Sequence, residues 1–200
     1  MVLVSRTEKE LQEVEEEITA AGGKGCAVVA DVTKRQDIDR IIKTAIMTYD
    51  SLEILINNAG THVASPFFEM DENEWNENMN INLKATLFLN QAALKIMKEN
   101  RQGYIINVSS TAALQVPARA VAYGISKLGV VGLTQALYEM GKEFGVKVSF
   151  IYPGMTDTQM LRSINLPVDP SDWMLPEDIT NCILFILKQS DRVVVKEIVP

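Results

Sequence analysis

Two kinds of segment alternate along the chain, and they differ in the spacing of their apolar residues. The first kind is short, apolar and rich in β-branched residues, with little polar alternation. These runs lie at 2–4, 26–31, 53–59, 104–109, 147–152 and 193–199. Such runs are typical of parallel strands that are buried on both faces. The second kind lies between the runs and repeats its apolar residues with the period of a helix. The alternation predicts a doubly wound α/β domain with a parallel sheet.

Capping patterns predict where several of these helices begin. A Thr or Asp followed three residues later by Glu or Gln is typical of a helix N-terminus. The pairs are Thr7 with Glu10, Thr33 with Gln36, and Asp71 with Glu74. Proline is favoured in the first turn of a helix, so Pro176 indicates where the last one starts.

Composition narrows the function classes. The 200 residues suffice for one domain spanning 1–200. A net charge of −7 without a basic cluster argues against binding to nucleic acid or an anionic membrane. We find no apolar stretch long enough to span a membrane, no signal-peptide pattern and no metal-ligand spacing. Cys26 and Cys182 lie in apolar runs, as expected of buried thiols in a reducing compartment. A cytoplasmic protein is therefore expected.

Polar residues and glycines follow five of the apolar runs. They are Ser5 and Arg6, Asp31 and Val32, Asn57 to Gly60, Ser109 and Ser110, and Pro153 and Gly154. In a doubly wound sheet, ligands bind beyond the carboxyl ends of the strands. We therefore expect all of these residues at one edge of the sheet, where a ligand site would form.

The stretch YGISK at 123–127 is the strongest candidate for chemistry. Tyr123 and Lys127 are four apart on a predicted helix, so both face the same side. A nearby ammonium favours the phenolate and lowers a tyrosine pKa, which makes the pair a plausible general acid and base. Ser110, thirteen residues before Tyr123, could hydrogen-bond a substrate carbonyl oxygen. Taken alone the pattern is weak, since Tyr and Lys are common on helix surfaces.

The Tyr123 and Lys127 pattern becomes specific because it is one of five motifs that follow each other along the chain. They are Asp31 after a strand, NNAG at 57–60, Asn82 in INL, the set Ser110, Tyr123 and Lys127, and PGMTDT at 153–158. With these the chain resembles the short-chain dehydrogenase/reductase family over essentially its whole length. The resemblance implies a Rossmann-like, three-layer α/β/α fold. It also implies hydride transfer between a nicotinamide and a carbonyl or secondary alcohol.

The resemblance implies a role for each catalytic residue. Tyr123 would give a proton to the carbonyl oxygen, and Lys127 would lower the tyrosine pKa and bind the nicotinamide ribose. Ser110 would orient the carbonyl, and Asn82 would hold a water that connects Lys127 to solvent. Neighbouring residues on a strand point to opposite faces, so only one serine of the pair can face the site. The family spacing selects Ser110, and Ser109 is expected to be structural.

The cofactor is expected to be NADP, with NAD less favoured. NAD enzymes usually place an acidic residue where this chain has Ser5 and Arg6, and a guanidinium can pair with a 2′-phosphate. The alternative is that Arg6 only starts a solvated loop. The residues implied to bind cofactor are Arg6, Asp31, Val32, Asn58, Ala59, Gly60, Tyr123, Lys127, Pro153, Gly154, Thr156 and Thr158. Asp31 and Val32 would lie by the adenine, and Thr158 would reach the carboxamide.

One family feature does not occur in this sequence. The family opens with a strand, a T-G-x-x-x-G-x-G turn and a helix, and none of the 11 glycines forms that pattern. That turn binds the pyrophosphate, and its strand is central in the strand order 3-2-1-4-5-6. We therefore expect a gap within the sheet. The sequence could be a piece of a longer chain, the fold could be rearranged, or a partner could supply the strand, and the first is favoured.

The remaining expectations concern substrate and partners. Residues 154–175, which include Leu166, are expected to form a substrate lid. His62 could touch substrate, although a solvated loop position is favoured. The nearest resemblance is to 3-oxoacyl-carrier-protein reductases and general carbonyl reductases, and the alternative function is a non-catalytic interaction module. A homotetramer or homodimer is expected through the helices that carry 85–97 and 124–140.

Overall fold

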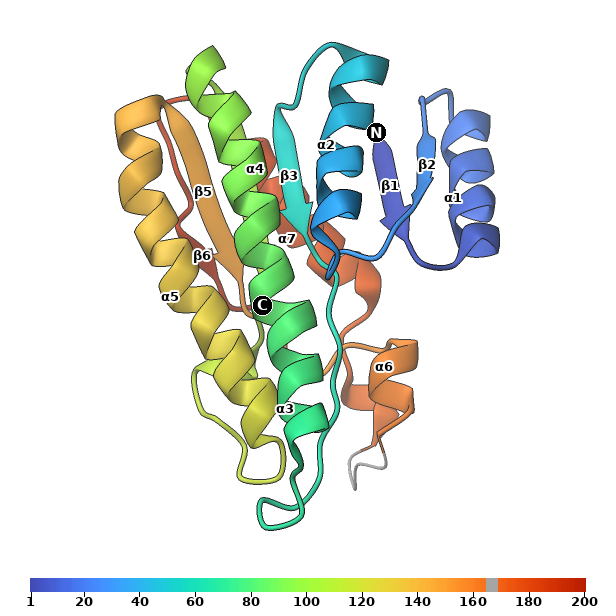
Figure 1. Cartoon of the computed structure of the whole chain (residues 1–200), viewed down its shortest axis with the longest axis vertical. Coiled ribbons are helices and arrows are strands. Elements are labelled where there is room, and N and C mark those ends of the chain that lie inside the picture. The colour runs from blue at the N-terminus through green and yellow to red at the C-terminus, as the bar shows by residue number, and fades with distance from the viewer. Residues whose placement is uncertain (165–168) are drawn as a thin grey trace.

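A computed structural model describes residues 1–164 and 169–200 of the chain (Figure 1). Among these residues, β3, β4, β5 and β6 form one parallel sheet in that order, and β1 pairs in parallel with β2. The strands are β1 Val2–Ser5, β2 Cys26–Val29, β3 Ile54–Asn57, β4 Gly103–Val108, β5 Val146–Ile151 and β6 Glu197–Ile198. Each lies in or overlaps one predicted apolar run. The last run is only partly a strand, since β6 has two residues.

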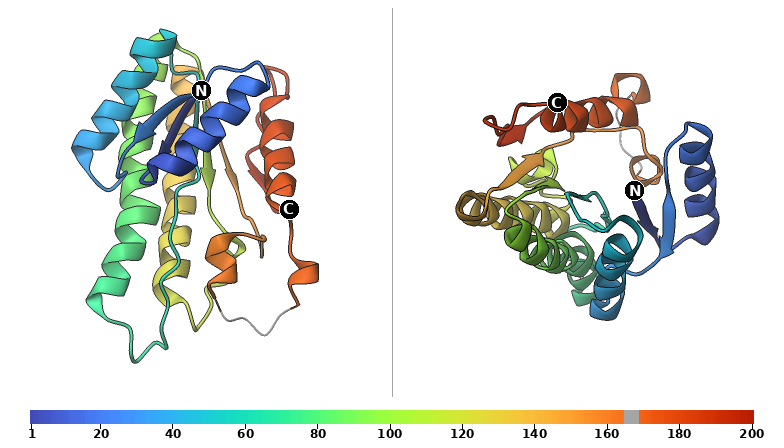
Figure 2. Two further views of the ribbon diagram at one scale, coloured as in Figure 1. Left: turned by 90° about the vertical axis from the view of Figure 1, so that its right-hand side faces the viewer. Right: turned by 90° about the horizontal axis from the view of Figure 1, so that it is seen from above.

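Helices cover both faces of the sheets. They are α1 Glu8–Ala20, α2 Arg35–Tyr49, α3 Glu72–Asn78, α4 Ala85–Asn100, α5 Val121–Phe144, α6 Gln159–Arg162 and α7 Pro176–Leu187. A π-helical turn, Met79–Lys84, joins α3 to α4. Figure 2 shows α2, α4 and α5 on one face and α1 and α7 on the other. The predicted three-layer, doubly wound α/β fold is confirmed.

The core explains why the strands read as unbroken apolar runs. In β4, Ile105 packs with α4 and α5, whereas its neighbour Ile106 packs with Ile186 of α7 on the opposite face. All three side chains are fully buried. A strand with a helix layer on each side has no face left for polar residues, so no alternation appears in its sequence.

The predicted capping patterns are only partly realised. Asp71 caps α3, and its carboxylate accepts a hydrogen bond from the Glu74 backbone N–H at 2.8 Å. Pro176 is the first residue of α7, as predicted. Thr7 occupies the N-cap position of α1, but its hydroxyl makes no capping hydrogen bond there.

The predicted start of the second helix at Thr33 is wrong. The helix α2 begins at Arg35, with Lys34 at its N-cap. The Thr33 hydroxyl instead donates to Asp31 Oδ1 at 2.7 Å, and the same oxygen accepts the Thr33 N–H at 3.0 Å. The carboxylate that follows β2 therefore uses the threonine in a local turn, which delays the helix.

The expected gap in the sheet lies between β1 and β3. Among the described residues, β1 pairs only with β2 and β3 pairs only with β4. In β3, Ile54 and Ile56 are 47% and 39% exposed, although their sequence is typical of a buried strand. The strands have not moved together, so the structure does not show the rearranged fold that was one explanation for the gap. The helix α2 packs against β1 and also against α4, and so connects the two sheets.

Two glycines of α5 provide a matched test of this packing. A Cβ on Gly141 would clash with the Val146 carbonyl oxygen at the start of β5, whereas one on Gly132 would meet no atom within 4 Å. We predict that Gly141→Ala lowers the free energy of unfolding by about 1–3 kcal/mol through overpacking. Gly132→Ala should raise it by about 0.5–1 kcal/mol, because alanine favours the helix. Urea denaturation measures both, and equal effects would contradict the packing of α5 on β5.

Candidate active site

The carboxyl ends of the strands meet at one end of the molecule. The arrowheads of β1 and β3 point the same way in Figure 1, toward the end where α3 and α6 lie. Beyond β4 and β5 the chains stay paired, because the Thr111 N–H donates to the Pro153 carbonyl at 2.9 Å. Ser110 and Gly154 are therefore brought to one place, as the topology predicted.

The first turns of α5 bring Tyr123 and Lys127 to this edge. Lys127 is 6% exposed, and its Nζ donates to the Val108 carbonyl at the end of β4, at 3.1 Å. The same Nζ lies 5.9 Å from the centroid of the Tyr123 ring. The spacing of four thus places the ammonium and the phenol side by side above the strand ends.

Burial sets the pKa values of this pair. Burial lowers the pKa of the Lys127 ammonium from its ordinary 10.5 to about 8, because the charged form loses its water. Burial also raises the pKa of Tyr123, and the neighbouring Ser110 hydroxyl acts in the opposite direction. The expectation was that Lys127 lowers the pKa of Tyr123. In the chain on its own, burial dominates and the shift is upward.

The two serines after β4 have different surroundings. Ser109 is buried, and its hydroxyl donates to the Lys127 carbonyl of α5 at 2.9 Å. Ser110 is half-buried beside Tyr123, and its Oγ accepts the Ala112 N–H at 3.1 Å. Ser109 therefore fastens α5 to the sheet, whereas the hydroxyl of Ser110 lies next to the Tyr123 phenol at the edge of the sheet.

Asn82 lies in the π-helical turn and connects two parts of the site. Its Oδ1 accepts the Thr61 N–H at 2.8 Å, and its Nδ2 donates to the Thr61 carbonyl at 3.0 Å and to Ser126 Oγ at 2.9 Å. Ser126 in turn donates to the Tyr123 carbonyl at 2.6 Å. The side chain thus links the loop after β3 to α5. The water-holding role implied for Asn82 stays a prediction.

The glycine of the NNAG stretch leaves space next to these groups. A Cβ on Gly60 would lie 3.3 Å from Asn82 Oδ1 and 3.4 Å from Lys127 Nζ, which is tighter than ordinary van der Waals contact. Asn58 and Ala59 are exposed at the end of β3. A glycine at this position keeps the approach to the lysine open.

Arg6 and Asp31 come together at the ends of β1 and β2. The Asp31 carboxylate accepts two hydrogen bonds from Thr33. These bonds hold the pKa of Asp31 below its ordinary value, with smaller contributions from Lys34 and Arg6. Arg6 itself is exposed, whereas Val32 is half-buried against the apolar side chains of this unit. The two halves of the predicted cofactor site thus lie on separate sheets.

The segment after Gly154 is held by local contacts. Thr156 forms an isolated parallel bridge with Met174, and its hydroxyl donates to the Gly154 carbonyl at 3.2 Å. The Thr158 hydroxyl oxygen accepts the Leu161 N–H at 3.2 Å and so caps α6. Leu166, which was assigned to the lid, lies outside the described residues. The lid assignment for 154–175 stays a prediction.

His62 is the residue that sequence reasoning placed wrongly. It was favoured as a solvated loop residue, but its ring lies 4.6 Å from the Tyr123 ring, centroid to centroid, and is half-buried. Glu74, Asn78 and Asn82, which hold the loop around it, recur every fourth residue. That spacing of polar residues on one helix face was the available signal.

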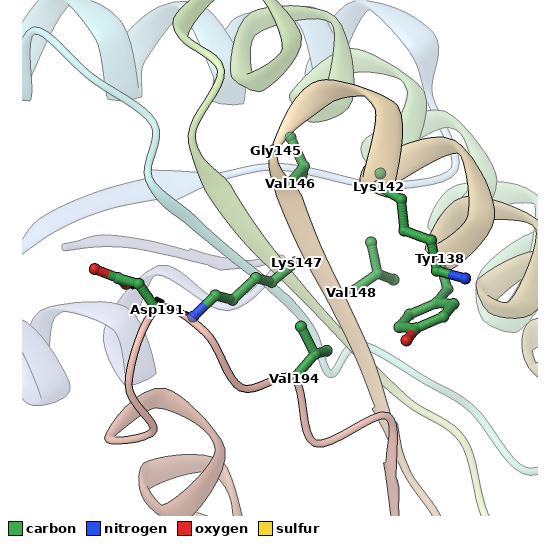
Figure 3. Close-up of a pocket in the computed structure, with 9 residues that line it drawn as sticks. Tyr138, Lys142, Gly145, Val146, Lys147, Val148, Asp191 and Val194 are labelled. Carbon is green, nitrogen blue, oxygen red and sulfur yellow. Dashed lines mark ion pairs between the residues drawn. The ribbon is translucent and has the colours of Figure 1, made fainter.

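A surface hollow near α5 is not part of this site. It lies beside the amino-terminal end of β5 (Figure 3). Pro153 follows the opposite, carboxyl end of that strand. Its two lysines have partners. Lys147 donates to the Ser190 carbonyl at 3.0 Å and lies 3.6 Å from Asp191, and Lys142 pairs with Glu139 at 2.8 Å. Each charged side chain that lines the hollow thus has an ion-pair partner.

Two features are absent from the part of the chain that the structure describes. No group of three or more His, Cys, Asp and Glu side chains is arranged to hold a metal ion. None of the described helices combines the length and apolar character needed to cross a membrane.

Known proteins resemble this chain in sequence and in structure. The family model described as short chain dehydrogenase matches residues 1–169. An uncharacterised oxidoreductase of Staphylococcus aureus strain USA300 is 35% identical over 198 residues, which make up 99% of this chain and 84% of that protein. These matches support an enzyme and give no support to the alternative of a non-catalytic interaction module.

Two solved structures share the fold. A metagenomic short-chain oxidoreductase in complex with NADP has a TM-score of 0.84 at 29% identity, covering 99% of this chain and 83% of the other. A 7α-hydroxysteroid dehydrogenase complexed with NADH and 7-oxo glycochenodeoxycholic acid has a TM-score of 0.92 at 24% identity, covering 100% and 82%. Motifs, fold and relatives agree, and the chain belongs to the short-chain dehydrogenase family of oxidoreductases.

Proposed function

We propose that this protein is an NADP-dependent oxidoreductase that interconverts a carbonyl and a secondary alcohol, with Tyr123 as general acid and base. The observation that carries the proposal is the convergence of Tyr123, Ser110 and Lys127 at the carboxyl edge of the sheet. A phenol, a hydroxyl and a buried ammonium together provide a proton, a hydrogen-bond donor and a charge. Those are the groups that a carbonyl oxygen needs when it becomes an alkoxide.

The residues at this edge fit the nicotinamide end of a dinucleotide. Among the described residues, the buried Lys127 has one hydrogen-bond acceptor, the Val108 carbonyl, so its ammonium retains donors for ribose hydroxyls. The space above Gly60, which a Cβ would fill, leads to that ammonium. When bound, the cofactor supplies the hydride.

The protein side chains handle the proton. Burial raises the pKa of Tyr123, so the phenol is protonated at neutral pH and is ready to donate to a carbonyl oxygen. Ser110 donates a hydrogen bond to the same oxygen and orients it. Lys127, with a pKa of about 8, is mostly charged at pH 7 and stabilises the phenolate that remains after donation. In alcohol oxidation the proton moves the opposite way, from the alcohol hydroxyl to the Tyr123 phenolate.

The preference for NADP rests on Arg6. Its guanidinium is exposed at the end of β1, close enough to Asp31 to contribute to the lowered pKa of that carboxyl. No carboxylate occupies the position after β1, where NAD enzymes usually bind the ribose hydroxyls. The metagenomic relative was crystallised with NADP and the hydroxysteroid dehydrogenase with NADH, so both cofactors occur on this fold.

The predicted pairing of subunits finds support on the outer helices. Leu87 of α4 and Ile125, Leu128 and Met140 of α5 are exposed apolar side chains. Apolar side chains of this size are enriched in the interfaces of stable oligomers. We keep α4 and α5 as the proposed contact between copies, and light scattering at micromolar concentration measures the number of subunits.

The proposed function predicts that Tyr123→Phe leaves the fold intact and lowers kcat for ketone reduction by about 10²–10⁴-fold. The phenyl ring keeps the packing but has no proton to give. Steady-state kinetics with NADPH and a panel of ketones measures the loss. The matched control is Tyr138→Phe on the same helix, which lines the distant hollow and should leave turnover unchanged. Near-normal turnover by Tyr123→Phe would reject the assignment.

The cofactor proposal predicts that Arg6→Ala narrows the preference for NADPH over NADH. Loss of one charge-assisted contact to the 2′-phosphate should weaken NADPH by about 10-fold or more and leave NADH nearly unchanged. The ratio of kcat/KM for the two cofactors measures the change. Lys9→Ala, in the exposed first turn of α1, is the charge-matched control. An unchanged ratio in Arg6→Ala would show that this arginine does not contact the phosphate.

The burial of the Lys127 ammonium predicts that this residue lowers the stability of the folded protein while it serves the proposed activity. The pKa of Lys127 is depressed from 10.5 to about 8, so the folded state disfavours its charge by about 3 kcal/mol. Lys127→Met should therefore abolish activity, yet raise the free energy of unfolding at pH 7. We expect a gain of about 2 kcal/mol, because the hydrogen bond to Val108 is lost at the same time.

The stability gain expected for Lys127→Met depends on pH. Between pH 8 and 10.5 the unfolded chain still holds the lysine proton and the folded chain does not, so wild-type stability rises with pH. The advantage of Lys127→Met should accordingly be constant below pH 8 and shrink toward pH 10.5. Denaturant unfolding at several pH values measures it, with the exposed Lys142→Met on the same helix as control. Destabilisation by Lys127→Met at pH 7 would contradict the account.

A further inference from the structure

A ladder of three buried side chains holds the loop that follows β3. Glu74, Asn78 and Asn82 lie four residues apart on α3 and the π-helical turn, and all three are buried. Each bonds one residue of the loop, in reverse order along it. Glu74 accepts the Ser65 hydroxyl proton, Asn78 Nδ2 donates to the Val63 carbonyl at 2.8 Å, and Asn82 bonds both backbone groups of Thr61. We call these three side chains the polar ladder.

The polar ladder fixes the backbone on both sides of His62. Thr61 before it and Val63 after it are each hydrogen-bonded to a buried side chain, so the peptide groups that flank the histidine have little freedom. Each of these buried hydrogen bonds restricts the backbone group that it holds, although Glu74 Oε1 and Asn78 Oδ1 have no hydrogen-bond partner among the described residues. These bonds hold the backbone on both sides of His62, and so limit where its imidazole ring can lie.

The ring that is held in this way packs on Tyr123. The two rings lie 4.6 Å apart at an interplanar angle of 53°, within the range of favourable aromatic pairs. Asn82 is also connected to Tyr123. Its Nδ2 donates to Ser126 Oγ, and the Ser126 hydroxyl donates to the Tyr123 carbonyl. One asparagine thus places both the loop with His62 and the helix with Tyr123.

We propose that His62 is a positioning residue for Tyr123. Held by the polar ladder, its ring packs against the phenol and restricts the direction in which the tyrosine hydroxyl meets a substrate carbonyl. The inference rests on the proposed function of Tyr123, and it assigns a role to a residue outside the family motifs described above. Misplacement of a reacting group by about 1 Å can cost about 10²-fold in rate, which is why a ring contact of this kind affects turnover.

The charges around His62 favour the neutral imidazole. Burial, the largest cause, lowers the pKa of His62, and Arg119 before α5 acts in the same direction. The ring's own backbone and the Glu74 carboxylate raise it by less. Tyr123 faces the ring from α5, with the Lys127 ammonium beyond it. At neutral pH the contact is thus between two uncharged aromatic rings.

Kinetics test the positioning role with two variants of the same residue. His62→Ala removes the ring and should lower kcat by about 10–100-fold with little change in KM, since the phenol is misplaced and substrate binding is not. His62→Phe restores a ring and should recover most of kcat. Glu69→Ala, an exposed position in the same loop, is the control. A loss confined to KM, or a His62→Phe variant as slow as His62→Ala, would overturn the proposal.

A second measurement does not depend on activity. His62 is the only histidine in the sequence, so selectively labelled protein gives one imidazole signal by NMR. That signal should titrate below the ordinary histidine pKa, and should shift in Tyr123→Leu, which removes the neighbouring ring, far more than in Tyr123→Phe. If the protein reduced no ketone, the proposed function would fail while this contact could still be observed. An imidazole signal whose chemical shift is unchanged in Tyr123→Leu would by itself overturn the positioning role.

Discussion

The burial of one ammonium group is the constraint on which the site depends. Lys127 is almost fully removed from water, and its hydrogen bond to the Val108 carbonyl is only partial compensation, which is why its pKa falls to about 8. A buried cation is costly unless polar groups around it compensate for the lost water, and here a backbone carbonyl does so in part. The end of β4 supplies the carbonyl, α5 supplies the lysine, and Gly60 leaves the approach open.

A second set of buried polar groups keeps those elements in register. Asn57, the last residue of β3, donates to Asn90 of α4 and to Asn107 of β4, both at 2.7 Å. Asn107 donates in turn to Thr134 of α5 at 2.9 Å. The network crosses two strands and two helices directly behind the site. Since the partners are specific, a slip of one residue between β3 and β4 would leave several buried groups unpaired.

The sequence predicted most of the architecture because apolar spacing reports burial. The strands could be located, and Tyr123, Lys127 and Ser110 could be placed at one edge, because parallel strands end together. The sequence did not predict which hydrogen-bond partners the short polar side chains have. Thr33 was expected to cap a helix, but it bonds Asp31 instead. His62 was expected in solvent because loops usually are, and its burial depends on side chains that lie 12 to 20 residues further along the chain.

The π-helical turn has a physical reason within the polar ladder. Positions four apart drift around an α-helix, which has about 3.6 residues per turn, so a ladder at 74, 78 and 82 would wind away from the loop. The turn at Met79–Lys84 is wider, with i→i+5 hydrogen bonds, and rotates the chain by less per residue. It therefore brings Asn82 back toward the face that carries Glu74 and Asn78. The same local widening thus lets one asparagine bond Thr61 and Ser126 together, and through them the histidine loop and the tyrosine helix.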